Sequence, residues 1–124
     1  MKVIQANNAP AAVGPYSHAY ISGNLVFTSG QIPISVGTGD IVGTCITEQT
    51  EQVVKNLKAI LEAAGVSLEK VIKTTCFLSD MADFATFNEV YAKHFTSKPA
   101  RSTFAVKQLP KNALVEIEAI AEKE

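Results

Sequence analysis

Residues 47–78 read TEQTEQVVKNLKAILEAAGVSLEKVIKTTCFL and predict one helix followed by one strand. From Val53 onward, apolar residues recur at i, i+4, i+7 and i+8, which is the spacing of one face of an α-helix. Thr47 is the expected N-cap, and Gly65 is the residue expected just after the helix. Residues 71–78 are rich in β-branched side chains and carry apolar groups toward both faces, which indicates a strand.

The sequence on either side of this stretch predicts a second helix and further strands. A helix is expected from a cap at Asp80 or Asp83 to about residue 96, and a turn at 109–113 makes the last two strands antiparallel neighbours. The strands are expected at residues 2–5, 18–21, 25–28, 101–108 and 114–121. We therefore predict a single domain over residues 1–124 with a two-layer α+β fold, in which a mixed β-sheet carries two helices on one face.

A two-layer fold leaves the second face of its sheet uncovered, and alternate residues of each strand point to that face. The candidate sets are partly apolar: Val71, Thr75 and Phe77, or Val115, Ile117 and Ala119. A partly apolar open face is typical of a protein interface. We therefore expect a homo-oligomer in which the open faces of the sheets meet.

Composition excludes several classes of function. A net charge of −1 with the lysines spread along the chain argues against a nucleic-acid surface. No apolar run approaches the length of a bilayer span, and no export-type apolar core follows residues 1–5, so a cytoplasmic protein is expected. Cys45 and Cys76 have no metal-ligand spacing, and neither do His18 and His94, so we expect no metal site and reduced cysteines.

Arg101 is the only arginine, and it lies in the stretch Pro99-Ala100-Arg101-Ser102-Thr103-Phe104. Pro99 favours an extended entry into the strand that follows, so Arg101 is expected where a loop enters a sheet. Its planar guanidinium matches a carboxylate in a way that a lysine ammonium does not. The alternative is an ordinary arginine in a surface ion pair.

Glu116 and Glu118 alternate with apolar residues in the last strand, so both carboxylates point to the same face. Either this face is simply solvated, or one acid has a chemical role. The predicted turn would place Glu116 opposite residues 105–107, several residues away from Arg101. The sequence alone therefore does not bring Glu116 and Arg101 together within one chain.

Four other residues are candidates for a binding site. Ser29 and Gly30 end a predicted strand, where a glycine allows close approach to a ligand or simply makes a turn. Tyr16 follows the rigid turn Gly14-Pro15 and either packs or lines a pocket. Asn88 lies on the second helix, where a solvated side chain is the ordinary interpretation.

Together these motifs resemble the RidA (YjgF, reactive intermediate deaminase) family along the whole chain. The matching segments are Gly14-Pro15-Tyr16, Phe27–Pro33, Lys73-Thr74-Thr75, Asp83–Asn88, Pro99–Ser102, Leu109-Pro110-Lys111 and Val115–Ala119. The resemblance implies a chorismate-mutase-like α+β fold, assembled as a homotrimer with sites between subunits. It further implies hydrolysis of 2-imino acids such as 2-iminobutanoate and 2-iminopropanoate, or of their enamine tautomers, to 2-keto acids and ammonia, without a metal or organic cofactor.

The resemblance also assigns roles to particular residues. Arg101 would hold the substrate carboxylate as a bidentate partner, and Glu116 would hold the attacking water and manage its proton. Tyr16, Ser29, Gly30 and Asn88 would line or support the cleft. Many members have a cysteine two residues after the arginine, where this chain has Thr103. That difference is harmless if the position acts through its backbone carbonyl, and it puts any thiol-dependent activity in doubt.

Two alternative functions are compatible with the same residues. A trimer that only binds or senses 2-keto acids would use the same arginine clamp without turnover. An endoribonuclease that inhibits translation is the other function attached to this family, and the near-neutral charge argues against it.

Overall fold

The structure is a computed structural model and describes residues 2–124. Two helices, α1 (Ile46–Ala63) and α2 (Phe84–His94), alternate with strands along the chain. The strands are β1 (Lys2–Ile4), β2 (Ala19–Ser22), β3 (Leu25–Thr28), β4 (Val71–Leu78), β5 (Ala100–Ala105) and β6 (Val115–Glu122). Three short 3₁₀ turns lie at Leu68–Lys70, Met81–Asp83 and Pro110–Asn112.

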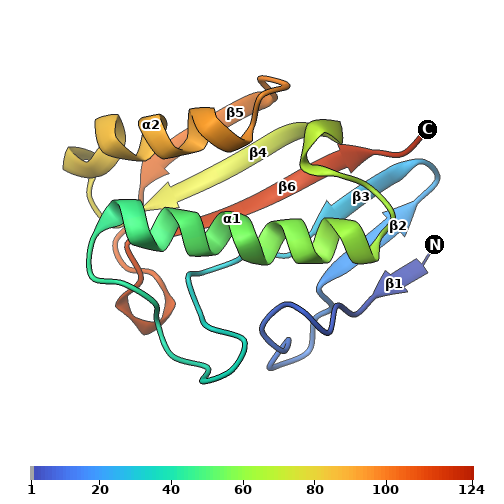
Figure 1. The fold of residues 1–124 in the computed structure, drawn as a ribbon, viewed down its shortest axis with the longest axis horizontal. Coiled ribbons are helices and arrows are strands. Elements are labelled where there is room, and N and C mark those ends of the chain that lie inside the picture. The colour runs from blue at the N-terminus through green and yellow to red at the C-terminus, as the bar shows by residue number, and fades with distance from the viewer. Residues whose placement is uncertain (1) are drawn as a thin grey trace.

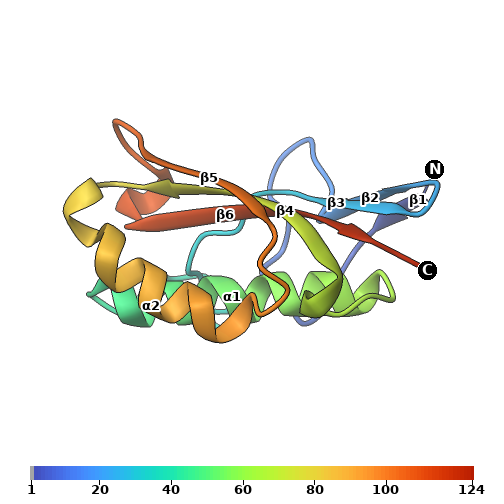
Figure 2. The same cartoon turned by 90° about the horizontal axis from the view of Figure 1, so that it is seen from above.

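The six strands form one mixed sheet in the order β1-β2-β3-β6-β4-β5. Strands β4 and β5 are parallel, and every other neighbouring pair is antiparallel. Both helices cover the same face of this sheet, as Figures 1 and 2 show. The predicted α+β fold of two layers is therefore confirmed.

The predicted pairing of the last two strands is wrong, because β4 lies between β5 and β6. The chain leaves β5 at Ala105, three residues earlier than expected, and the Val106 N–H donates to the Leu78 carbonyl oxygen. Strand β6 then enters the sheet between β3 and β4, where four of its side chains are buried under the helices. Strand β5, which has no fully buried residue, takes the sheet edge.

Local capping explains how the helices begin and end. The predicted N-cap Thr47 is wrong, because α1 begins at Ile46 and its N-cap is Cys45. The Glu48 carboxylate in the first turn accepts a hydrogen bond from the Thr44 N–H at 3.1 Å and holds the preceding loop against the helix. The Asp80 carboxylate accepts from the Ala82 N–H at 2.8 Å and caps the 3₁₀ turn that leads into α2, which ends at His94. Gly65 has φ +87°, as expected for a residue that terminates a helix.

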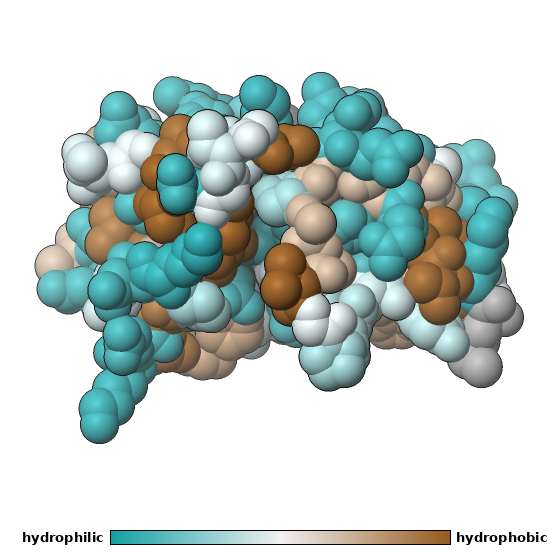
Figure 3. Space-filling model, turned by 90° about the horizontal axis from the view of Figure 1, so that it is seen from below, coloured by the Kyte–Doolittle hydropathy of each residue, from teal (hydrophilic) through white to brown (hydrophobic). Residues whose placement is uncertain are grey.

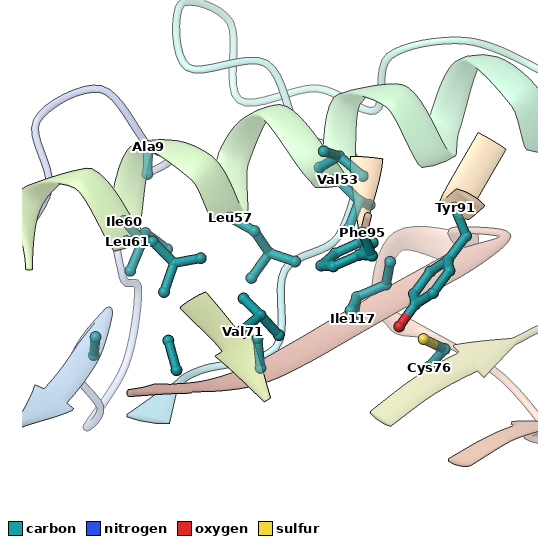
Figure 4. Close-up of a cluster of buried hydrophobic side chains, with 14 of the residues drawn as sticks. Ala9, Val53, Leu57, Ile60, Leu61, Val71, Cys76, Tyr91, Phe95 and Ile117 are labelled. Atoms are coloured by element: carbon teal, nitrogen blue, oxygen red, sulfur yellow. The ribbon is translucent and has the colours of Figure 1, made fainter. Parts of the chain in front are cut away.

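The core lies between the helices and the covered face of the sheet. Leu57, Ile60 and Leu61 of α1 are fully buried, and Figure 4 shows them near Val71 and Ile117 of the sheet. The apolar face predicted for this helix is therefore the face that packs against the sheet. Burial of each such side chain contributes about 1.5–3 kcal/mol of transfer free energy.

The open face carries part of one predicted set and none of the other. Thr75 and Phe77 of β4 point to it, but Val71 is buried because the register shifts between Val71 and Lys73. The other set is wrong, since Val115, Ile117 and Ala119 are buried on the helix side. The register instead puts exposed apolar side chains on the open face: Val3, Tyr20, Phe27 and Phe104.

Other parts of the surface are also partly apolar. The side of the molecule seen in Figure 3 carries separate groups of hydrophobic side chains with hydrophilic ones between them. Within residues 2–124, neither helix combines the length and the apolar composition needed to cross a bilayer.

Candidate active site

The predicted site residues fall into two groups in the folded chain. Tyr16, Ser29, Gly30 and Glu116 line one cleft of about 320 Å³, which we call the Glu116 cleft. Its remaining lining residues are Pro10, Ala11, His18, Gln31, Ile32, Ile34 and Pro110. The other predicted residues, Arg101, Asn88 and Thr103, come from β5 and α2 at the opposite edge of the sheet.

Glu116 and Gly30 are brought together by a bridge between β6 and the segment that follows β3. Gln31 and Ile117 exchange two backbone hydrogen bonds of 2.9 and 3.1 Å in an antiparallel bridge. The residues that precede them in the chain, Gly30 and Glu116, therefore lie diagonally across from each other on one face of the bridge. The Glu116 carboxylate lies directly over Gly30, so a Cβ atom on residue 30 would collide with it. Gly30 is therefore required here for close approach, as the sequence suggested in general terms.

Burial changes the acidity of Glu116. The partly buried carboxylate loses hydration, and the neighbouring Glu118 carboxylate adds repulsion, so the pKa of Glu116 is raised above its ordinary value of 4.5. Burial is the larger of the two causes. A carboxylate with a raised pKa is a stronger base than an ordinary one and is suited to taking up and returning a proton.

His18 supports the wall of the Glu116 cleft, and sequence reasoning missed this role. Its ring is buried; Nδ1 accepts a hydrogen bond from the Ala6 N–H at 2.8 Å, and Nε2 lies 2.6 Å from the Pro10 carbonyl oxygen. Because Nδ1 is an acceptor, the proton belongs on Nε2, which then donates to Pro10. The His18 carbonyl oxygen accepts from the Ser29 N–H at 2.9 Å, so the same residue also positions Ser29.

Arg101 lies against one face of α2. Its Nη1 donates to Asn88 Oδ1 at 2.8 Å, and its Cζ atom lies 4.7, 5.6 and 5.9 Å from the ring centroids of Tyr91, Phe84 and Phe87. These four α2 residues have the i, i+3, i+4, i+7 spacing of a helix face, and we call them the Arg101 cradle. The contact of Phe84, Phe87 and Tyr91 with Arg101 was not predicted from the sequence.

Within residues 2–124, no carboxylate lies within 4.0 Å of the Arg101 guanidinium. The alternative of a surface ion pair is therefore not found in the described chain. Asn88 and aromatic rings stabilise the cation without neutralising it. The guanidinium keeps its full charge and part of its donor capacity for an anion.

Two neutral groups lie on the same side of the sheet as Arg101. Thr103 follows two residues later on β5, and its buried hydroxyl oxygen has no hydrogen-bond partner in the part of the chain described here. Cys76, its partner across the ladder, is buried, and burial raises the pKa of this thiol to about 11. Such a thiol is protonated at neutral pH, which argues against a catalytic role for it.

Arg101 and Glu116 do not meet within one chain. Arg101 is in register with Thr74 of β4, on the helix side, whereas Glu116 is in register with Phe77, on the open side. Side chains of one β-strand alternate between faces, so β4 and the plane of the sheet separate the two groups.

The sequence and the fold match one family. Residues 6–123 match the family model described as Endoribonuclease L-PSP, which covers nearly the whole chain. The chain belongs to this family, the RidA/YjgF family.

Individual RidA-family proteins are similar along their full length. The RutC family protein PH0854 of Pyrococcus horikoshii is 58% identical, over 99% of this chain and 98% of its own. The 2-iminobutanoate/2-iminopropanoate deaminase of Escherichia coli is 46% identical, over 97% of this chain and 96% of its own. The crystal structure of E. coli TdcF with bound serine has a TM-score of 0.94 at 44% identity and covers 100% of both chains.

A cluster of side chains that could bind a metal ion is not present among residues 2–124. Among residues 2–124, no three His, Cys, Asp or Glu side chains gather closely enough to hold a metal ion. The two polar groups around Arg101 and Glu116 are instead suited to binding an anion and transferring a proton.

Proposed function

We propose that this protein is a deaminase that hydrolyses 2-imino acids, such as 2-iminobutanoate and 2-iminopropanoate, to 2-keto acids and ammonia. The observation that carries the proposal is the Arg101 guanidinium, which is held rigidly by its cradle and has no carboxylate partner within residues 2–124. A small organic acid supplies the missing anion through a bidentate pair of charge-assisted hydrogen bonds.

Glu116 is the proposed proton carrier. Its carboxylate accepts a proton from a water molecule as the water oxygen adds to the imine carbon, and the C=N electron pair moves to nitrogen. The proton then passes to that nitrogen, which gives a tetrahedral intermediate with one hydroxyl and one amino group. Glu116 next takes the hydroxyl proton and delivers it to the amino nitrogen, the C–N bond breaks, ammonia leaves, and the oxygen electron pair forms the carbonyl group. An imine is already electrophilic, so positioning and one oriented water supply the catalysis required. The raised pKa makes Glu116 a stronger base than an ordinary carboxylate, which favours proton uptake from water.

The site is proposed to be shared between copies of the chain in a homotrimer. Arg101 and Glu116 face opposite sides of one sheet, so Arg101 of one copy would act with Glu116 of the next. The exposed apolar side chains of the open face, including Phe27 and Phe104, support such an interface. Tyr16, Ser29 and Gly30 would line the cleft beside Glu116, while Asn88 would hold Arg101.

Thr103 is proposed to act through its backbone rather than through its side chain. Its hydroxyl oxygen is buried and faces away from solvent, whereas its carbonyl lies in edge strand β5. The serine bound to E. coli TdcF, a relative with 44% identity, is a small molecule with a carboxylate, the group that this proposal requires of the ligand.

Turnover of a freshly generated imine tests the proposal. A threonine dehydratase generates 2-iminobutanoate, and its loss is followed with and without the purified protein. We expect acceleration above buffer, and loss of about 10-fold or more of it in Arg101→Lys, because an ammonium cannot form the bidentate pair. Lys93→Ala, on the exposed side of α2, is the matched control and should keep full activity. A rate equal to that of buffer would overturn the proposal.

A binding protein without turnover is the second candidate, since the same clamp holds the 2-keto acid product. Saturable binding of 2-oxobutanoate together with no acceleration of imine loss would select it.

The family description Endoribonuclease L-PSP favours a third candidate. RNA cleavage that co-purifies with the protein to homogeneity and is lost in Arg101→Ala would support it. Cleavage that persists in this variant or disappears on purification would come from a contaminant.

A further inference from the structure

We propose that Tyr91 is a positioning residue that fixes the direction of the Arg101 guanidinium. The ring of Tyr91 is the closest of the three aromatic rings to the guanidinium, with 4.7 Å from its centroid to Cζ. This inference rests on the proposed function for its catalytic consequence, and on contacts within the chain for its geometry.

Tyr91 is itself fixed from two sides. Its hydroxyl group shares a 2.7 Å hydrogen bond with the Thr74 hydroxyl, which is fully buried in β4. Its ring stacks on Phe95 with a centroid distance of 4.3 Å and an interplanar angle of 22°. These two contacts together fix the position and the tilt of the Tyr91 ring relative to the sheet.

The pairing of β4 with β5 connects Tyr91 and Arg101 a second time. Thr74, which holds the Tyr91 hydroxyl, is the residue in register with Arg101 on the neighbouring strand β5. Thr74 therefore holds the Tyr91 ring next to Arg101, the residue whose guanidinium the ring contacts. Asn88, one turn earlier on α2, fixes Nη1 from a second direction.

Burial keeps the Tyr91 hydroxyl in its neutral form. Loss of hydration raises the pKa of this phenol, so it remains an O–H group that pairs with Thr74 across the physiological range. A cation over such a ring gains about 0.5–2 kcal/mol, depending on how far it is removed from water. That gain is lost if the guanidinium turns away, so the ring favours one direction.

Three variants separate positioning from general packing. Tyr91→Phe keeps the ring and loses the Thr74 partner, and Tyr91→Leu removes the ring. Val90→Ala is the control for packing, because Val90 is buried on the same helix but is not part of the Arg101 cradle and does not stack on Tyr91.

The first measurement is independent of any ligand. Arg101 is the only arginine, so the side-chain N–H signals of its guanidinium are unambiguous in an NMR spectrum of the intact protein. We expect Tyr91→Leu to shift these signals strongly and to increase their exchange with water, Tyr91→Phe to do so weakly, and Val90→Ala to leave them near their original positions. Equal changes in Tyr91→Leu and Val90→Ala would overturn the inference.

The second measurement is the affinity for 2-oxobutanoate, with each variant made alone and in an Arg101→Lys background. Tyr91→Leu should weaken binding about 3- to 30-fold, which is the fold-change equivalent of a cation–π contact. In the Arg101→Lys background it should have little further effect, because the group that it positions has changed. Equal weakening in both backgrounds would reduce Tyr91 to a packing role and overturn the inference.

The two measurements also separate this inference from the proposed function. If the wild-type protein bound no 2-oxobutanoate while the guanidinium signals still depended on Tyr91, the substrate proposal would fail and the positioning role would stand.

Discussion

Arg101 and Glu116 project to opposite faces of one sheet, with strand β4 between the strands that carry them. Their surroundings are separate, since Arg101 contacts α2 and the Glu116 carboxylate lies over Gly30. A single chain therefore contains two half-sites, and a second copy is needed to complete either one under the proposed mechanism.

Mixed oligomers test this composite site. Arg101→Lys and Glu116→Gln should each be inactive alone, but their co-expressed mixture should regain activity, because a cleft between unlike copies combines intact Arg101 with intact Glu116. Random mixing in a cyclic trimer leaves about a quarter of the clefts intact. Imine turnover by the mixture, compared with each variant alone, is the measurement. A mixture no more active than its components would contradict a shared site.

Gly30→Ala should damage turnover without unfolding the protein. The added methyl group takes the space of the Glu116 carboxylate, whose flexible end must move away. A displacement of a proton carrier by about 1 Å is expected to lower the rate about 10-fold or more. Gly37→Ala is the matched control, since a Cβ atom there meets nothing closer than Ser35 Oγ at 3.9 Å. Equal activity of the two variants would show that Glu116 need not lie where it does.

Much of the fold was predictable because it depends on local periodicity. The stripe from Val53 to Ala64, the strand at 71–78 and the turn at Gly65 all have short-range causes, and all were found. The position of β6 was not predictable from the turn at 109–113, because strand order depends on which strand gains most from a central, doubly paired position.

The candidate site shows the same division. The sequence and the family resemblance pointed to Arg101 and Glu116, which are conspicuous as a lone guanidinium and an acid between apolar residues. His18 and Tyr91 were overlooked, because their importance comes from hydrogen bonds and ring contacts with residues 8 to 17 positions away. The sequence around a histidine or a tyrosine does not show that its side chain will be buried or which distant residues it will contact.

Glu116→Gln should raise stability at neutral pH while it lowers turnover. The folded-state pKa of Glu116 is raised by burial, so its contribution to stability is complete below the ordinary value of 4.5 and is lost as pH rises through the folded-state pKa. The amide avoids that loss, so the variant should unfold at higher denaturant than wild type at pH 7. The two proteins should converge below pH 4.5.

Denaturant unfolding at a fixed protein concentration measures this difference. Glu62→Gln, an equal change of charge at an exposed position on α1, is the control and should alter stability little at any pH. Glu118→Gln adds a second check, because removing its charge should lower the pKa of Glu116 and move the acid limb of the turnover profile to lower pH. A wild-type protein more stable than Glu116→Gln at pH 7 would contradict the raised pKa.

Asn56 should prove important for stability although it interrupts the apolar face of α1. Its side chain is buried, and its amide N–H₂ donates to the carbonyl oxygens of Ile32 and Ile34 at 3.2 and 3.0 Å, which hold the cleft-lining segment against the helix. The Ile32 carbonyl oxygen also accepts from the Ile34 N–H at 2.8 Å, and the Ile34 carbonyl oxygen also accepts from Gln52 Nε2 at 3.4 Å, so each keeps one donor in Asn56→Ala. The variant loses two hydrogen bonds at a buried position and should lower the free energy of unfolding by about 1–3 kcal/mol. Lys55→Ala, the exposed neighbour on the same helix, should change it by less than about 0.5 kcal/mol. Urea unfolding of both variants at one protein concentration measures the contrast, and an Asn56→Ala protein as stable as Lys55→Ala would show that the two hydrogen bonds contribute nothing net.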